Sequence, residues 1–139
     1  MSKIKILDLM KKKELVSRQS ASDVVGKLNA ELEKCRRVTN DIDEIARQKS
    51  SFSKKSDCYS FQSDRQLLLK LMEQKEILLN RQEFLSDEKQ SASGHLSKIQ
   101  KKIEYLESKR VQAEAEARSK RLADWEDSQQ NKKLSLIHI

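Results

Sequence analysis

The sequence predicts an all-α fold in which two long helices form an antiparallel coiled-coil hairpin. Its 139 residues include two glycines and no proline, so the turn residues that a β-sandwich or an α/β domain needs are missing. Charged residues make up 37% of the chain, against about 25% in an average domain, which disfavours a thick core. Apolar residues recur at alternating spacings of three and four in two long stretches, as they do in coiled coils.

The first apolar stripe predicts a helix over residues 4–52. Steps of three and four from Leu7 reach fourteen positions, of which ten are apolar, whereas the composition alone would give about five. Leu15, Val25, Leu32 and Ala46 widen this stripe on one side. The fourteen positions are Leu7, Met10, Glu14, Ser17, Ala21, Val24, Leu28, Glu31, Cys35, Val38, Ile42, Ile45, Lys49 and Phe52.

A second stripe predicts a helix over residues 61–130. Ten of its fourteen positions are again apolar. Beyond Leu106 we expect the apolar phase to shift to Val111, Ala115, Leu122 and Trp125. The fourteen positions are Phe61, Asp64, Leu68, Leu71, Lys75, Leu78, Gln82, Leu85, Lys89, Ala92, Leu96, Ile99, Ile103 and Leu106.

The segment 53–60 is rich in Ser, Lys and Asp and predicts a loop between the two helices. Folding the chain there pairs positions whose numbers sum to 113, so that each stripe covers the other. We therefore expect one coiled-coil rod over 1–139, with the second helix overhanging the first and a tail at 131–139. The pairs expected to face each other include Phe52–Phe61, Lys49–Asp64, Cys35–Leu78, Glu31–Gln82, Leu28–Leu85, Met10–Ile103 and Leu7–Leu106.

Two other arrangements are compatible with the same pattern. A single continuous helix could form a parallel dimer, although the phase would then have to persist through the serine-rich segment. A turn at 91–94, beside Gly94, would give three helices. We read both Gly94 and Gly26 as flexible points within helices, because the stripes continue through them.

Charge and cysteine usage indicate a cytosolic protein with reduced thiols. The net charge is +7, which permits an acidic protein, an acidic lipid or a nucleic acid as partner. Cys35 lies on the first stripe and is expected to be a small core residue, while Cys58 has no nearby second ligand for zinc. No stretch has the length of a signal peptide or of a membrane span.

No catalytic constellation is visible. His95 and His138 lie far apart, the serines lack a nucleophile context, and Asp41, Asp43 and Glu44 are typical of a solvated helix face. We therefore expect no enzymatic activity, no cofactor and no metal. The basic run 11–13 is either solvated or an anchor for an acidic partner or anionic lipid. The overhanging segment near Trp125 is either a docking element or a frayed end.

Both ends of the chain resemble one family. The opening Lys3–Glu14 is short, apolar and basic, and the segment Lys109–Lys133 is rich in Arg, Glu and Ala. Together with the size and the two-helix layout, these features resemble the small coiled-coil stalk proteins of flagellar and related type III export systems, the FliJ family. The resemblance covers the whole chain through its general layout.

The resemblance implies a cytoplasmic, non-enzymatic stalk or adaptor that is monomeric in isolation and reaches the inner membrane only through its partners. It would couple a hexameric export ATPase to the cytoplasmic domain of the export gate, and it would also bind export chaperones. The residues that the resemblance assigns to the ATPase are Lys11, Lys12, Lys13, Arg118, Arg121 and Trp125. The residues that it assigns to the export gate are Tyr59, Phe61, Gln62 and Arg65. The alternatives are a homodimeric coiled-coil scaffold and a basic helical protein that binds nucleic acid.

Overall fold

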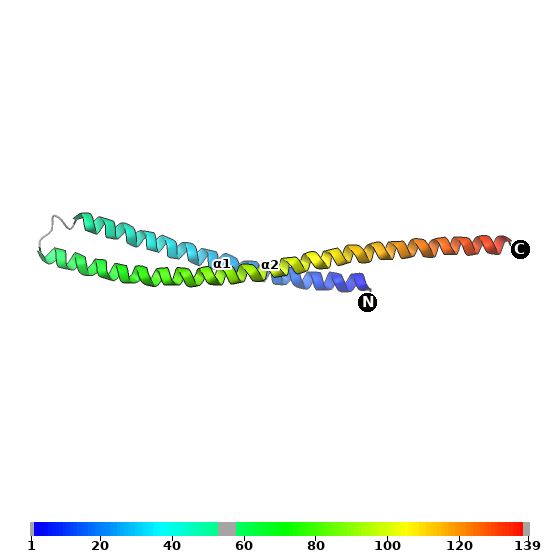
Figure 1. Cartoon of the computed structure of the whole chain (residues 1–139), viewed down its shortest axis with the longest axis horizontal. Helices are drawn as coiled ribbons and strands as arrows, with labels where there is room; N and C mark the ends of the chain where they lie inside the picture. Colours follow the sequence, from blue (N-terminus) through cyan, green and yellow to red (C-terminus); the bar gives the residue numbers. More distant parts are fainter. Residues whose placement is uncertain (1, 53–57, 138–139) are drawn as a thin grey trace. The chain divides into compact units, whose positions relative to one another are not determined.

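The computed structural model describes residues 2–52 and 58–137, and it confirms the all-α helical hairpin. Helix α1 spans Lys3–Phe52 and helix α2 spans Cys58–Ile137, and the two helices pack against each other (Figure 1). Side-chain surroundings are described for residues 2–49 and 61–137. Within this described part, neither helix has a stretch apolar enough to cross a lipid bilayer.

Helix α1 matches its expected range except that it begins one residue earlier, whereas α2 extends past both of its expected ends. Helix α1 begins at Lys3, where the Lys5 N–H donates a hydrogen bond to Ser2 Oγ at 3.3 Å, so Ser2 acts as the N-cap. Helix α2 begins at Cys58, inside the expected loop, and continues to Ile137, through most of the expected tail. No glycine or proline follows Gly94, so the sequence contains no strong stop signal there. The remainder of the expected loop, 53–57, and the final residues, 138–139, lie outside the described residues.

Contacts within the chain define two compact units. Unit 1 comprises Met1–Gln19 with Ser97–Ile139, and unit 2 comprises Ser20–Leu96. In each unit a segment of α1 packs antiparallel to a segment of α2, and each unit has its own buried residues and ion pairs.

The core of unit 2 is a small apolar cluster. Leu32, Cys35 and Leu85 are buried together, and the partly buried Leu28 and Leu78 pack against them. This arrangement agrees with the expected pairs Cys35–Leu78 and Leu28–Leu85, and it confirms Cys35 as a core residue. Burying one leucine of this kind contributes about 2 kcal/mol to the free energy of unfolding. Because the cluster is small, each of its residues accounts for a large share of the packing energy in unit 2.

Polar contacts in unit 2 fix its direction and show where the expected register fails. Lys49 Nζ lies 3.6 Å from Asp64 Oδ1, as the pairing predicts. The expected pair of Glu31 with Gln82 is wrong. Arg81 Nη2 instead binds Glu31 Oε2 at 3.2 Å, and the Gln82 amide donates to Thr39 Oγ1 at 3.0 Å.

The expected stripe on α1 is wrong at five of the thirteen positions whose side chains are described. The structure buries or half-buries Leu32, Thr39 and Ala46, whereas Val24, Val38 and Ile45 are exposed. Cys35 and Ile42 are buried and belong to the expected stripe. The buried set lies on one side of these two residues around the helix and the exposed set lies on the other. Helix α1 is therefore rotated about its axis relative to the expected seam. Thr39 is accommodated because its hydroxyl donates to the Cys35 carbonyl at 2.8 Å, which satisfies a buried polar group. Met10, in unit 1, is exposed in the same way.

The expected stripe on α2 agrees with the structure at all positions except its first, because Phe61 is exposed and the other thirteen are buried or half-buried. The expected phase shift after Leu106 does not occur. The same spacing continues to Arg110, Ala113 and Ala117, whereas Val111 is exposed.

Unit 1 has a narrower core, and charged residues line it. Its buried residues on α2 are Ile99, Ile103, Leu106 and Ala113. On α1 the buried residue is Glu14, whose Oε1 lies 3.0 Å from Lys102 Nζ. A buried carboxylate is tolerated here because it is paired, and removing Lys102 would leave that charge uncompensated.

The two glycines occupy continuous helix, as expected. Gly26 lies within α1 and Gly94 within α2, and neither has a positive φ angle. A Cβ atom added at either position would meet nothing within 4 Å. The three-helix arrangement with a turn at 91–94 is therefore wrong.

Candidate functional site

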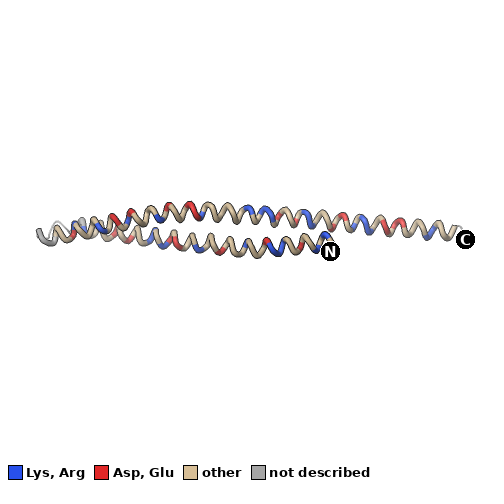
Figure 2. Tube along the Cα trace, turned by 90° about the horizontal axis from the view of Figure 1, so that it is seen from below, with Lys and Arg blue, Asp and Glu red and all other residues tan. Residues whose placement is uncertain are grey.

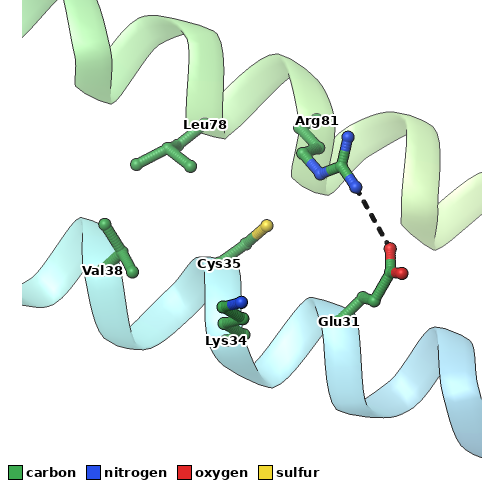
Figure 3. Close-up of a pocket in the computed structure, with 6 residues that line it drawn as sticks. All are labelled: Glu31, Lys34, Cys35, Val38, Leu78 and Arg81. Carbon is green, nitrogen blue, oxygen red and sulfur yellow. Dashed lines mark hydrogen bonds and ion pairs between the residues drawn. The ribbon is translucent and has the colours of Figure 1, made fainter.

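The described residues contain no group of three or more His, Cys, Asp or Glu side chains that could hold a metal ion. The concave feature shown in Figure 3 is a surface depression of about 240 Å³ in unit 2. Cys35, Val38 and Leu78 give it apolar walls, and the ion pair between Arg81 and Glu31 crosses one end. It lies alongside the helix seam, and no nucleophile and base are paired in it.

The three lysines of the basic run 11–13 have different surroundings. Lys11 Nζ donates to Glu107 Oε2 at 2.6 Å, so this lysine forms part of the packing of unit 1. Lys12 and Lys13 are exposed. Figure 2, which colours Lys and Arg alike in blue, shows basic segments of α1 near the N-terminus.

The contact with Lys11 changes the acidity of Glu107. The hydrogen bond from Lys11 and the positive charge of that lysine hold the pKa of the Glu107 carboxyl below its usual value, with a smaller contribution from Arg110. Arg110 Nε itself lies 2.9 Å from Asp8 Oδ1, although the N–H is not aligned for a hydrogen bond. Two ion pairs between the helices therefore follow one another at this end of unit 1.

The last part of α2 has no partner within unit 1. Residues 118–137, which we call the overhang, are exposed except for the half-buried Gln129. At 1.5 Å per residue the overhang is about 30 Å long. It continues past the N-terminus of α1 in Figures 1 and 2. Its boundary at 118 is set by packing, since Ala117 is the last half-buried position on the seam.

The overhang carries three of the residues assigned to the ATPase, namely Arg118, Arg121 and Trp125. Arg118, Leu122 and Trp125 follow one another at spacings of four and three, so they share a face. The Trp125 side chain is 60% exposed. Arg121 is also exposed, and its Nε donates to the Ala117 carbonyl at 3.3 Å.

The structure separates the two groups that the sequence assigns to one docking surface. Lys11 lies opposite Glu107, and Arg118 is eleven residues further along α2, which is about 16 Å along the helix axis. The basic run of α1 and the overhang are therefore different surfaces of unit 1.

The residues assigned to the export gate lie at the start of α2. Phe61, Gln62 and Arg65 are exposed, and Phe61 and Arg65 share a face at a spacing of four. Tyr59 lies in the first turn of α2, and its side chain is outside the described residues.

Sequence reasoning missed one surface. In unit 1 the side of α1 that faces away from α2 exposes Ile6, Leu9, Met10 and Val16. The available signal was the excess of apolar positions in residues 4–16, which is more than one seam can bury. The heptad spacing predicts Met10 in the seam, whereas the structure exposes it.

The chain was also compared with known proteins. No protein-family model, no curated protein and no solved structure matches it.

Proposed function

We propose that this chain is a non-enzymatic helical adaptor of a type III protein export apparatus, and that its overhang docks onto the hexameric export ATPase. The proposal combines the resemblance of both chain ends to the FliJ family with one observation. The observation is an unpartnered helical segment of 20 residues that carries an exposed tryptophan and two exposed arginines.

The composition of the overhang suits docking. Trp and Arg are the residues most enriched among those that dominate binding energy at protein interfaces. Trp125 and Leu122 supply apolar area that is already exposed, and Arg118 and Arg121 supply charge next to it.

The proposal narrows the set of ATPase-binding residues. It keeps Arg118, Arg121 and Trp125. It leaves out Lys11, because Glu107 already engages that side chain, and it leaves out Lys12 and Lys13, because they lie on a different surface.

Binding to the purified hexameric export ATPase of the same host tests the proposal. Trp125→Ala should weaken binding about thirtyfold, the effect of losing a dominant interface residue of about 2 kcal/mol. Phe84→Ala is the matched control, because Phe84 is an equally exposed aromatic residue of α2 in unit 2. Helicity measured by circular dichroism should be the same in both variants. If the wild-type chain fails to bind, or if the two variants bind equally well, the proposal is wrong.

The proposal extends to the export gate through Phe61, Gln62 and Arg65. Phe61→Ala with Arg65→Ala should weaken binding to the cytoplasmic domain of the gate and leave ATPase binding intact. The reverse pattern would contradict this assignment.

A specific observation favours a second candidate, the homodimeric scaffold. Val24, Val38 and Ile45 are exposed on one side of α1 in unit 2, at spacings that are multiples of seven. Such a line of apolar residues can pack against another helix. Light scattering on the purified chain decides between the two candidates, because the adaptor should have a mass of 16.2 kDa and the scaffold twice that mass.

A further inference from the structure

In unit 1, α1 directs charged residues toward α2 and apolar residues away from it, the reverse of the usual arrangement in a helix pair. The side that faces α2 holds Asp8, Lys11, Glu14 and Arg18, all engaged in polar contacts with α2. The side that faces away exposes Ile6, Leu9, Met10 and Val16, and Val16 is 73% exposed. Packing between the two helices therefore does not explain the outward apolar residues.

Lysines surround these apolar residues. Lys3, Lys5, Lys12 and Lys13 are all exposed. Among the described residues, none of these four lysines forms an ion pair with an acidic side chain. The only acidic residues between positions 3 and 18 are Asp8 and Glu14, and α2 already neutralises both through Arg110 and Lys102. The outward face is consequently positive without an internal counter-charge.

The geometry of the face combines the two properties at short range. Lys5 and Lys12 are seven residues apart and so lie two turns apart on one side of α1, with Leu9 between them. These residues line a depression of about 250 Å³ together with Asp8, which lies at its edge toward α2 and whose carboxylate is paired with Arg110. A negatively charged group can lie between the two ammonium groups while the attached apolar chain contacts Leu9.

We propose that this face of α1 binds an anionic lipid surface directly. An interfacial helix presents apolar residues to the boundary between headgroups and acyl chains, and its lysines extend their charged ends to the headgroups. An acidic protein would satisfy the lysines, but it would not call for apolar residues spread over three turns among them. This contact differs from association through partners, and it uses a surface separate from the overhang.

Sedimentation of the full chain with unilamellar vesicles tests the proposal. The chain should bind vesicles of phosphatidylcholine that contain about one third phosphatidylglycerol, and it should not bind vesicles of phosphatidylcholine alone. Added salt should weaken the binding, because screening reduces the attraction between lysines and headgroups.

A matched pair of lysine variants separates this face from general positive charge. Lys12→Gln with Lys13→Gln should weaken vesicle binding more than tenfold, since each lysine near an anionic surface accounts for about a fivefold change in affinity. Lys132→Gln with Lys133→Gln removes the same charge from the overhang and should have little effect. Equal losses in the two variants would overturn the proposal, as would failure of the wild-type chain to bind anionic vesicles.

A second pair tests the apolar contribution. Leu9→Ser with Val16→Ser should reduce vesicle binding, and the remaining binding should be abolished by salt. Leu69→Ser, at an exposed leucine of α2 in unit 2, should bind like the wild type. All three altered side chains are exposed, so we expect unchanged thermal unfolding, which would exclude a folding defect as the cause. Unchanged vesicle binding after loss of Leu9 and Val16 would overturn the proposed insertion.

Discussion

The contribution of a leucine to stability depends on its environment, as Leu32 and Leu69 show. Leu32 is 3% exposed in the core of unit 2, whereas Leu69 is 56% exposed on α2. Leu32→Ala removes buried surface and leaves a cavity beside Cys35 and Leu85. We expect it to lower the free energy of unfolding by about 2–3 kcal/mol, measured by urea titration followed by circular dichroism.

Leu69→Ala is the control, with an expected change within about 0.5 kcal/mol. Equal effects of the two substitutions would mean that α1 is not rotated as the structure has it, since the sequence alone placed Leu32 at the edge of the seam.

The pair formed by Lys11 and Glu107 should make unit 1 sensitive to acid. The hydrogen bond and charge of Lys11 lower the pKa of Glu107 below the value of 4.5 that it has without such contacts. The pair therefore stabilises the folded state above that pH, and the stabilisation is lost as the pH falls through the lowered pKa. We expect the thermal midpoint to fall on acidification, and Glu107→Gln should reduce that fall.

Glu116→Gln provides the comparison, because Glu116 is exposed on the same helix and forms no ion pair within the described residues. If both variants respond to acid like the wild type, Glu107 does not contribute to the pH dependence.

At the scale of the elements, Gly26 and Gly94 make their helices less stable than alanine would, and no close packing requires a glycine at either position. An added Cβ atom at Gly26 or Gly94 meets no neighbour, and both residues have ordinary helical backbone. Alanine costs about 1 kcal/mol less than glycine in a helix interior. Gly26→Ala and Gly94→Ala should therefore each raise the free energy of unfolding by about 0.5–1 kcal/mol.

The measurement is again urea titration, and Ala30→Gly in α1 gives the opposite substitution at an exposed site. A loss of stability at either glycine would show that its backbone takes up a conformation other than the regular helix.

The overhang should be the most dynamic of the regular elements. It lacks tertiary contacts, and isolated helices of about this length are marginal in water. Hydrogen exchange should therefore be fast for the amides of 118–137 and slow for those of 99–113, which are packed against α1. Equal protection in the two segments would indicate that something covers the overhang in solution.

At the scale of the whole molecule, opening can be followed through Cys35. Its thiol is buried and makes no disulfide, so it should react slowly with a thiol reagent until unit 2 opens. In a Cys58→Ser background the reaction should accelerate with urea in parallel with the loss of helicity. Rapid reaction of the native chain would contradict the core of unit 2.

The fold class and the α2 seam could be predicted from the sequence because ten of the fourteen positions on the α2 stripe are apolar and one spacing persists along it. Helix α1 offers two apolar stripes, since Val38 and Leu32 lie on either side of Cys35 and both are apolar. Periodicity cannot choose between them, because the choice depends on contacts with α2, such as that between Gln82 and Thr39. The helical end at 131–137 departs from the expected tail because no glycine or proline stops the helix there, although the apolar residues from Leu134 break the charged pattern.

Prediction of the candidate sites from the sequence was similarly uneven. The exposed Trp125 followed from its place beyond the expected partner helix. The separation of Lys11 from Arg118 could not be foreseen, because it depends on which α2 residue lies opposite Lys11. The outward apolar face of α1 was hidden because Met10 fitted the heptad count.

The single tryptophan of the chain lies in the overhang and away from both cores. Its fluorescence should therefore already resemble that of a solvated indole in the native chain, and it should change little while the cores melt. A blue shift of the emission would then report that another molecule covers that helix. Binding of a partner to the overhang can therefore be followed by intrinsic fluorescence without an added label.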